Sequence, residues 1–261
     1  MLRGPARFDR LLLAAETSSA HGQLCARVCG QDLCQFNMLD AAQLARLFEV
    51  LDLQPHEHLL DLGCGVGRLT EHLAARTGAR ATGVDFAVAT MARARERSLA
   101  KSARVRFEVR DLNQDPLPAR EFDAVIAIDS LYFIDDLYAA VRDLARALRP
   151  GGRMALFYSQ IAHQAGAEIL QPDQTWLARA LRAASLSYEV DDFTQNERRL
   201  WRQIETTLGE LRSAFFAEGQ RGLYRARRFE SRKMSRMAAA GRLARYLYLV
   251  RAGGVSDEYQ A

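Results

Sequence analysis

Residues 61–70 read "DLGCGVGRLT" and place three glycines, at 63, 65 and 67, directly after an apolar run. The preceding residues, "HLLDL" at 58–62, have the pattern of a buried strand, and residues 66–76 have the spacing of a helix. Glycine lets a backbone turn sharply and lets a ligand lie against it, because it has no Cβ atom. The stretch therefore predicts a strand, a binding loop and a helix in that order.

The same strand and helix rhythm continues along the chain. Apolar segments with strand character recur at 79–86, 104–109, 122–129 and 153–159, with helical patterns between them. Two more strands are predicted at 185–190 and 245–250. Strands that alternate with helices form a parallel sheet with helices on both faces. We therefore predict an α/β fold with a mostly parallel, seven-stranded sheet.

Two helical regions lie outside this rhythm. Residues 1–54 are assigned to an N-terminal helical cap segment, although the first 40 residues show no clear period and only the stretch after Asp40 reads as a helix. The second region is a helical insertion at about 195–240, between the last two strands. Residues 55–261 would then form one domain, with its core motifs in 55–160. We expect the insertion to act as a lid.

Three kinds of binding loop compete for the glycine-rich turn. A P-loop needs a lysine after its last glycine, and none stands here. The dinucleotide fingerprint G-x-G-x-x-G fits Gly63 and Gly65 but meets Arg68 at its third glycine. The pattern present is D-x-G-x-G-x-G, from Asp61 to Gly67.

That pattern, followed by "GVDFA", "VRDLNQDPLP" and "FDAVIAIDSLYFIDD" in order, resembles the class I S-adenosylmethionine-dependent methyltransferases. The resemblance covers about residues 55–160 and implies a Rossmann-like fold. It also implies that the cofactor is S-adenosyl-L-methionine, bound along the carboxyl ends of the strands. The protein would then be a methyltransferase.

The resemblance also implies roles for individual residues. The glycine loop would lie against the methionine and ribose parts of the cofactor, with Asp61 toward its amino group. Asp85 would accept hydrogen bonds from the ribose hydroxyls, as acids do at this position in dinucleotide folds. The full set of implied cofactor-binding residues is Asp61, Gly63, Cys64, Gly65, Gly67, Asp85, Phe86, Asp111, Leu112 and Asp129. Each aspartate has an alternative role as a helix cap or turn residue.

Residues near the methyl group are candidates for catalysis and acceptor binding. Asp129, Tyr132 and His163 are the catalytic candidates, and Asp129 can alternatively cap the following loop. Tyr132, Tyr158 and Trp201 are the candidates for contact with the acceptor, and Trp201 can alternatively be plain core. The motifs of nucleobase methyltransferases are missing: "IDSLY" stands where N-P-P-Y or D-P-P-Y would be. The expected acceptor is therefore a small molecule, methylated on nitrogen or oxygen.

The charge distribution raises an alternative partner. Residues 195–245 hold 13 Arg and Lys against 5 Asp and Glu, a net charge of +8 within a chain of +4. An RNA methyltransferase using this stretch is therefore one alternative, and a non-catalytic S-adenosylmethionine-binding protein or a nicotinamide oxidoreductase are others. We expect no tight nucleic-acid binding, because the arginines interleave with glutamates.

Cysteine spacing and hydropathy bound the remaining possibilities. Cys25, Cys29 and Cys34 are spaced C-x3-C-x4-C, which matches no common zinc motif, so we expect no metal and buried thiols instead. No apolar run reaches the about 20 residues that a membrane helix needs. We therefore expect a cytoplasmic protein without a membrane span; the sequence leaves its oligomeric state open.

Overall fold

The computed structural model describes residues 5–99, 104–162 and 167–251. It contains one seven-stranded sheet with the strand order β3-β2-β1-β4-β5-β7-β6. The strands are β1 (His58–Leu62), β2 (Arg80–Asp85), β3 (Val105–Val109), β4 (Phe122–Ile128), β5 (Leu148–Ile161), β6 (Tyr188–Asp192) and β7 (Leu243–Arg251). Neighbouring strands pair in parallel except at β7, which is antiparallel to both β5 and β6. The predicted mostly parallel, seven-stranded α/β sheet is confirmed.

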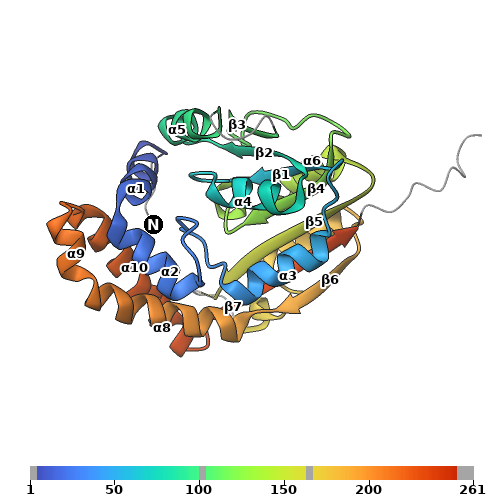
Figure 1. Cartoon of the computed structure of the whole chain (residues 1–261). Coiled ribbons are helices and arrows are strands. Elements are labelled where there is room, and N and C mark those ends of the chain that lie inside the picture. Colours follow the sequence, from blue (N-terminus) through green and yellow to red (C-terminus); the bar gives the residue numbers. More distant parts are fainter. Residues whose placement is uncertain (1–4, 100–103, 163–166, 252–261) are drawn as a thin grey trace, which may run out of the picture.

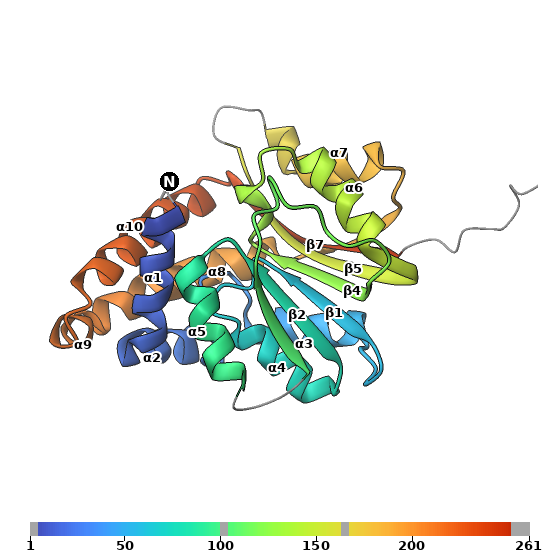
Figure 2. The same ribbon diagram turned by 90° about the horizontal axis from the view of Figure 1, so that it is seen from above.

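Helices cover both faces of the sheet (Figure 2). On one face, α3 (Ala41–Leu51), α4 (Arg68–Thr77) and α5 (Val88–Leu99) pack on the side chains of β1, β2 and β4. On the other face lie α6 (Leu137–Ala147) and α7 (Trp176–Ala183). Strands buried on both faces read as continuous apolar runs, which is the pattern that "FDAVIAI" at 122–128 shows.

The helices outside the two faces form a separate group at one side of the sheet (Figure 1). This group consists of α1 (Pro5–Thr17), α2 (Ser19–Cys29), α8 (Thr194–Glu210), α9 (Arg212–Ala217) and α10 (Arg221–Ala239). Its apolar side chains form one buried cluster that also includes Val66 of the glycine loop and Ala87, just after β2. The group therefore packs on the carboxyl edge of the sheet, where the binding site is expected.

The first 40 residues are more regular than the sequence reading allowed. Helix α1 buries Leu12 and Ala15, and Phe8 and Leu11 pack beside them at helical spacing. Helix α2 begins after Ser18, whose side chain accepts from the backbone N–H of His21, and ends at Gly30 with φ 89°. The prediction of no clear period in this segment is therefore wrong, because its described residues form two helices, α1 and α2. The predicted N-cap at Asp40 is confirmed by its bond from the N–H of Gln43.

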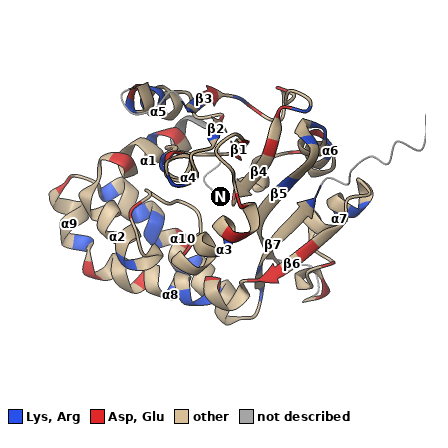
Figure 3. Cartoon of the chain, turned by 45° about the vertical axis from the view of Figure 1, so that its right-hand side comes forward, with Lys and Arg blue, Asp and Glu red and all other residues tan. Residues whose placement is uncertain are grey.

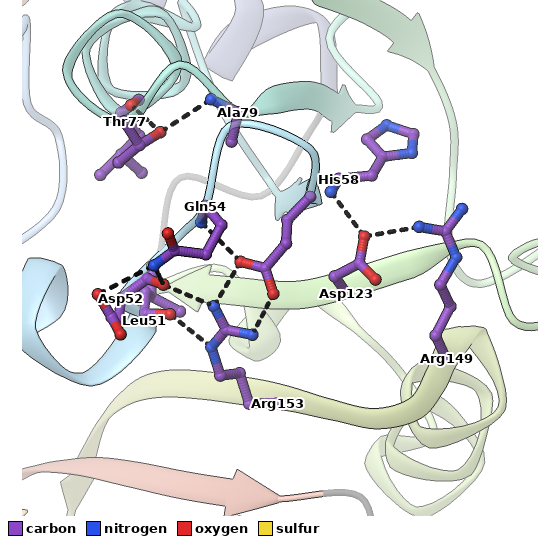
Figure 4. Close-up of polar contacts among 11 residues, drawn as sticks. Leu51, Asp52, Gln54, His58, Thr77, Ala79, Asp123, Arg149 and Arg153 are labelled. Carbon is purple, nitrogen blue, oxygen red and sulfur yellow. Dashed lines mark hydrogen bonds and ion pairs between the residues drawn. The ribbon is translucent and has the colours of Figure 1, made fainter.

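The amino-terminal edge of the sheet is closed by protein side chains (Figure 4). Arg153 pairs with Glu57 at 2.7 Å and donates to the carbonyl of Leu51. Asp123 accepts from the backbone N–H of His58 at 2.8 Å and from Arg149 at 2.6 Å. These contacts tie β1, β4 and β5 together at the end opposite to the glycine loop.

Candidate functional site

The glycine loop joins β1 to α4, and its three glycines all have positive φ angles of 71°, 55° and 75°. Residues other than glycine rarely adopt positive φ angles. A Cβ atom on Gly63 would lie 2.3 Å from the Cβ of Ser130, and one on Gly67 would lie 2.3 Å from the ring of Phe107. A Cβ atom on Gly65 would meet only Leu12, at 3.8 Å. Packing therefore requires glycine at 63 and 67, whereas Gly65 leaves an open cradle in the backbone.

The end of β2 supports this loop through Asp85. Its Oδ2 accepts from the N–H of Gly65 at 3.0 Å and its Oδ1 from the N–H of Ala87 at 2.9 Å. The side chain is buried, and burial raises the pKa of the carboxyl group. Asp85 therefore fixes the open glycine and caps the next turn at the same time, so both roles considered for it are geometrically available.

Asp61 and Cys64 lie beneath the loop. Asp61 is 3% exposed and accepts from the hydroxyl of Thr70 at 2.6 Å. Burial raises the pKa of Asp61 to about 7. The sulfur of Cys64 packs against Met91 and beside Gly83 of β2, so only the backbone of Cys64 belongs to the loop surface.

The implied adenine side of the site contains aromatic rings from three elements. The ring centroids of Phe86 and Phe133 lie 6.1 Å apart, and Phe8 of α1 lies 6.2 Å from the first and 5.5 Å from the second. Asp111 accepts from the N–H of Asn113 at 3.0 Å, within the turn that follows β3. Leu112 is partly buried against the apolar cluster of the sheet.

The turn after β3 is joined to the loop after β4. The side chain of Asn113 donates to the carbonyl of Phe133 at 3.2 Å and accepts from the N–H of Asp135 at 2.8 Å. The fold thus brings the segments after β1, β2, β3 and β4 together, as expected for the carboxyl ends of parallel strands.

Helix α1 covers this edge, which the sequence analysis did not anticipate. Asp9 accepts from the N–H groups of Ala89 and Thr90 at the start of α5, at 3.0 and 2.9 Å. A carboxylate is favourable at a helix N-terminus. Further along α1, Glu16 pairs with Arg97. These contacts hold Leu12 over Gly65 and Phe8 against Phe86.

Asp129, the candidate at the end of β4, has φ 55°, a strained conformation for a residue with a side chain. Its Oδ1 accepts from Arg245 Nη1 at 2.6 Å and from the hydroxyl of Tyr132 at 3.1 Å. Its Oδ2 accepts from the N–H of Met38 at 2.8 Å. Both oxygens are therefore engaged, and the geometry suits a group that orients its neighbours.

Tyr132 and Tyr158 lie side by side, with ring centroids 5.0 Å apart. Tyr132 is 42% exposed, and its hydroxyl oxygen also accepts from the N–H of Ser159 at 2.5 Å. Tyr158 is buried in β5. The structure thus places Tyr132 in hydrogen-bond contact with Asp129, and Tyr158 beside Tyr132. His163 lies outside the described residues.

Two charged residues of this site were missed by the sequence analysis. Arg245 of β7 is fully buried and donates to Gln43 at 2.7 Å, to Asp129, and to the hydroxyl of Ser159 at 3.0 Å. Glu197 of α8 is 1% exposed and accepts from Ser159 at 2.8 Å and from the indole N–H of Trp201 at 3.0 Å. Burial raises the pKa of Glu197 to about 7. An arginine at the start of the apolar run "RYLYLV" was the one signal for Arg245.

Trp201 is 3% exposed and belongs to the apolar cluster that joins α8 to α1 and α2. Its polar contact is the bond to Glu197, so it reaches the acceptor side of the site only through that carboxyl group. Nη2 of Arg245 is buried without a hydrogen-bond partner in the part of the chain that the structure describes. This corner of the site can therefore receive one further hydrogen-bond acceptor.

The described part of the chain holds neither a metal-binding group of side chains nor a membrane-spanning helix. No group of three or more His, Cys, Asp or Glu side chains there is arranged to hold a metal ion. Cys25, Cys29 and Cys34 are free and buried, and burial raises the pKa of Cys25 to about 11. Within the same residues, none of the helices combines the length and apolar character required to cross a bilayer.

The region of the chain that contains the glycine loop is similar to known proteins. Residues 59–152 match the family described as methyltransferase domain. The methyltransferase GfsG of Streptomyces halstedii is 38% identical over 113 residues, which cover 42% of this chain and 41% of that protein. The 27-O-demethylrifamycin SV methyltransferase of Amycolatopsis mediterranei is 37% identical over 113 residues, covering 42% of each chain. The chain thus spans about two fifths of the length of these curated relatives.

Solved structures share the fold over most of the chain. Phosphoethanolamine N-methyltransferase 2 of Haemonchus contortus, in complex with phosphomonomethylethanolamine and S-adenosylhomocysteine, superposes with a TM-score of 0.75. The match covers 94% of this chain and 60% of that one at 19% identity. The [4+2]-cyclase SpnF matches with a TM-score of 0.62 and 23% identity, over 81% of this chain and 80% of that one. At such identities the likeness shows the fold alone.

Proposed function

We propose that the protein is a class I S-adenosylmethionine-dependent methyltransferase that methylates an oxygen or nitrogen atom of a small molecule, because residues 59–152 match the family described as methyltransferase domain. The observation that carries this proposal is the cradle at Gly65. Its backbone is open, it is fixed by the buried Asp85, and α1 covers it through Leu12. The residues present therefore fit S-adenosylmethionine, which lies against such a loop without needing a phosphate site.

On the donor side, the roles implied by the resemblance become part of the proposal. Asp85 would accept from the ribose hydroxyls with the lone pairs that Gly65 and Ala87 leave free. Phe86 would pack on the adenine, Asp111 would accept from its amino group, and the backbone N–H of Leu112 would meet the ring. Asp61, which is buried, would contact the amino group of the cofactor through a water molecule.

On the acceptor side, the chain has to orient a nucleophile. Bound S-adenosylmethionine supplies an already activated methyl group, so alignment is the main task, and it can contribute about 7–11 kcal/mol. Asp129 would position the hydroxyl of Tyr132 rather than remove a proton, because both its oxygens accept hydrogen bonds. The unpartnered Nη2 of Arg245 would donate to a lone pair of the acceptor.

The alternative of RNA methylation is less well supported. The arginines of α8 and α10 are interspersed with acidic residues (Figure 3). Arg227 pairs with Glu230 at 2.7 Å, and Arg228 and Arg232 both lie within 4 Å of Glu205, at 3.6 and 3.8 Å. Such pairs reduce the charge available to phosphates. We therefore retain a small-molecule acceptor as our proposal. We also propose a cytoplasmic location.

A protein that binds the cofactor without transferring a methyl group is the second alternative, because fold neighbours include a cyclase and fold alone does not fix a reaction. The test has two steps. S-adenosylhomocysteine should raise the melting temperature, since a ligand that binds only the folded state stabilises it, and NAD should not. Incubation with methyl-labelled S-adenosylmethionine and extracts of small metabolites should then give a labelled product.

Asp85→Ala provides the matched variant for the first step. It should weaken S-adenosylhomocysteine binding by about 1–3 kcal/mol, the range for losing partners of buried hydrogen bonds. Asp123→Asn is the control, because Asp123 serves only structural bonds at the opposite edge of the sheet (Figure 4). Stabilisation by NAD but not by S-adenosylhomocysteine would contradict the proposal. Binding without any labelled product would favour the non-catalytic alternative. Steeply salt-dependent submicromolar RNA binding would favour the RNA methyltransferase.

A further inference from the structure

A buried group of charges lies at the carboxyl end of β4 and comprises Asp129, Glu197 and Arg245. Arg245 is 0% exposed and Glu197 is 1% exposed, and the side chain of Asp129 is 13% exposed. Arg245 donates to Asp129, and the hydroxyl of Ser159 joins the other two residues, because it accepts from Arg245 and donates to Glu197. We call these three residues the charge cluster.

The charges in the cluster do not balance. One guanidinium faces two carboxyl groups, and it forms its ion pair with Asp129, at 2.6 Å. The hydrogen bonds that Glu197 accepts among the described residues come from neutral donors, the hydroxyl of Ser159 and the indole of Trp201, and Arg245 acts on it only through space. A buried carboxylate without an ionic partner is costly, since the low dielectric of the interior disfavours its charge. The cluster therefore holds a second negative charge only at an energetic cost, and a further positive charge nearby would favour that charge.

The position of the cluster indicates where that positive charge would come from. Asp129 directly precedes Ser130, and Ser130 is the residue against which Gly63 of the glycine loop packs. The hydroxyl of Ser130 also donates to the carbonyl of Leu62 at 2.6 Å, at the start of that loop. The cluster is thus joined to the donor-binding loop on one side and to Tyr132 on the other.

We propose that the charge cluster recognises the positive charge of the methyl donor, so that the protein binds S-adenosylmethionine more tightly than its neutral-sulfur product S-adenosylhomocysteine. This inference rests on the proposed function. The sulfonium of S-adenosylmethionine would supply the positive charge that Glu197 lacks. After transfer the sulfur is neutral, so Glu197 loses this additional positive charge and the product is held less tightly.

The titration of Glu197 makes the proposal measurable. The groups that face it are Arg245 from β7, Asp129 after β4, Ser159 from β5, Tyr132 and, on its own helix, Trp201. With its pKa raised by burial to about 7, Glu197 changes charge near neutral pH. A nearby cation lowers the pKa of an acid, so S-adenosylmethionine should favour the ionised form. Its affinity relative to S-adenosylhomocysteine should therefore rise as the pH increases through this range.

The experiment measures the dissociation constants of both ligands by calorimetry between about pH 6 and about pH 8. A difference of one unit in the pKa of Glu197 between the two complexes corresponds to about a tenfold change in their affinity ratio. We expect this ratio to shift toward S-adenosylmethionine by up to about tenfold in the wild-type protein and to lose that shift in Glu197→Gln. Titration of the ligands themselves is common to both proteins and cancels in this comparison.

Two further variants keep the test decisive. Glu210→Gln, at the exposed end of the same helix, where Glu210 pairs with Arg27, should behave as the wild type. If Glu197→Gln fails to fold, Trp201→Phe takes its place. This variant keeps the carboxyl group of Glu197 and removes its indole donor, so the midpoint of the pH-dependent change in the affinity ratio should move to higher pH. An affinity ratio with the same pH dependence in wild type and Glu197→Gln, or an unmoved midpoint in Trp201→Phe, would overturn the inference. Absence of binding by both ligands would instead refute the proposed function.

Discussion

Gly63 lies so close to Ser130 that a Cβ atom on the glycine would be 2.3 Å from the Cβ of the serine. This contact joins the glycine loop after β1 to the segment after β4, which carries Asp129 and Tyr132. Because Gly63 has no side chain, the two segments pack directly against each other, and this contact holds the two halves of the candidate site together. Gly65, two residues away, has no comparable contact.

The first prediction compares these two glycines. Gly63→Ala should reduce the free energy of unfolding by more than about 2 kcal/mol, because it adds a clash to a left-handed conformation that itself costs about 1–2 kcal/mol. Gly65→Ala should lose only the conformational part but should abolish S-adenosylhomocysteine binding, because its methyl group fills the cradle. Chemical denaturation and calorimetry give the two quantities. Equal binding by wild type and Gly65→Ala would show that the cradle is not a ligand site.

The second prediction concerns the pH dependence of stability. The pKa of Asp61 is about 7 in the folded protein and near 3.8 when exposed, so between these values the folded state binds the extra proton. The free energy of unfolding should therefore fall as the pH rises from about 4 to about 7, by at most about 1.4 kcal/mol per pH unit from this residue. The raised pKa of Glu197 likewise makes the free energy of unfolding fall as the pH rises toward about 7.

Asp61→Asn isolates the contribution of Asp61, because the amide does not titrate in this range. Its free energy of unfolding should fall less steeply than that of the wild type over the same interval. Parallel curves for the two proteins would contradict the assignment of a raised pKa to this carboxyl group.

A third prediction follows from the position of α1. Asp9 holds this helix on the start of α5, and loss of such a cap costs about 0.5–2 kcal/mol. Asp9→Ala should therefore speed amide hydrogen exchange in residues 5–17 and increase the dissociation rate of S-adenosylhomocysteine. Exchange in β4 should stay as in the wild type. A dissociation rate unchanged by the variant would mean that α1 does not cover the ligand.

The fourth prediction separates two roles for Trp201. Its ring is 3% exposed among the apolar side chains of α1, α2 and α8, so Trp201→Ala should reduce the free energy of unfolding by about 3–5 kcal/mol. The hypothesis that the 195–240 insertion is a lid predicts a different result. It requires fast hydrogen exchange in α8 without ligand, slowed by ligand, and a loss of acceptor turnover larger than the loss of stability.

The sequence by itself determined the alternation of strands and helices and the glycine loop. These features depend on local geometry: the period of apolar residues, the backbone freedom of glycine and the capping of helix ends. It also contained the signals for α1 and α2, since Phe8, Leu11, Leu12 and Ala15 stand at helical spacing, and Cys25 and Cys29 lie one turn apart.

Only the tertiary structure decided which side chains share the site. Glu197 and Arg245 are separated by two helices in the chain and meet because β7 inserts between β5 and β6, antiparallel to both. In the same way, α1 covers the glycine loop because Asp9 finds the start of α5, 80 positions along the chain from Asp9 to Ala89. No local pattern encodes such contacts, since they arise when elements distant in sequence bury a common apolar surface and their charged groups have to find partners there.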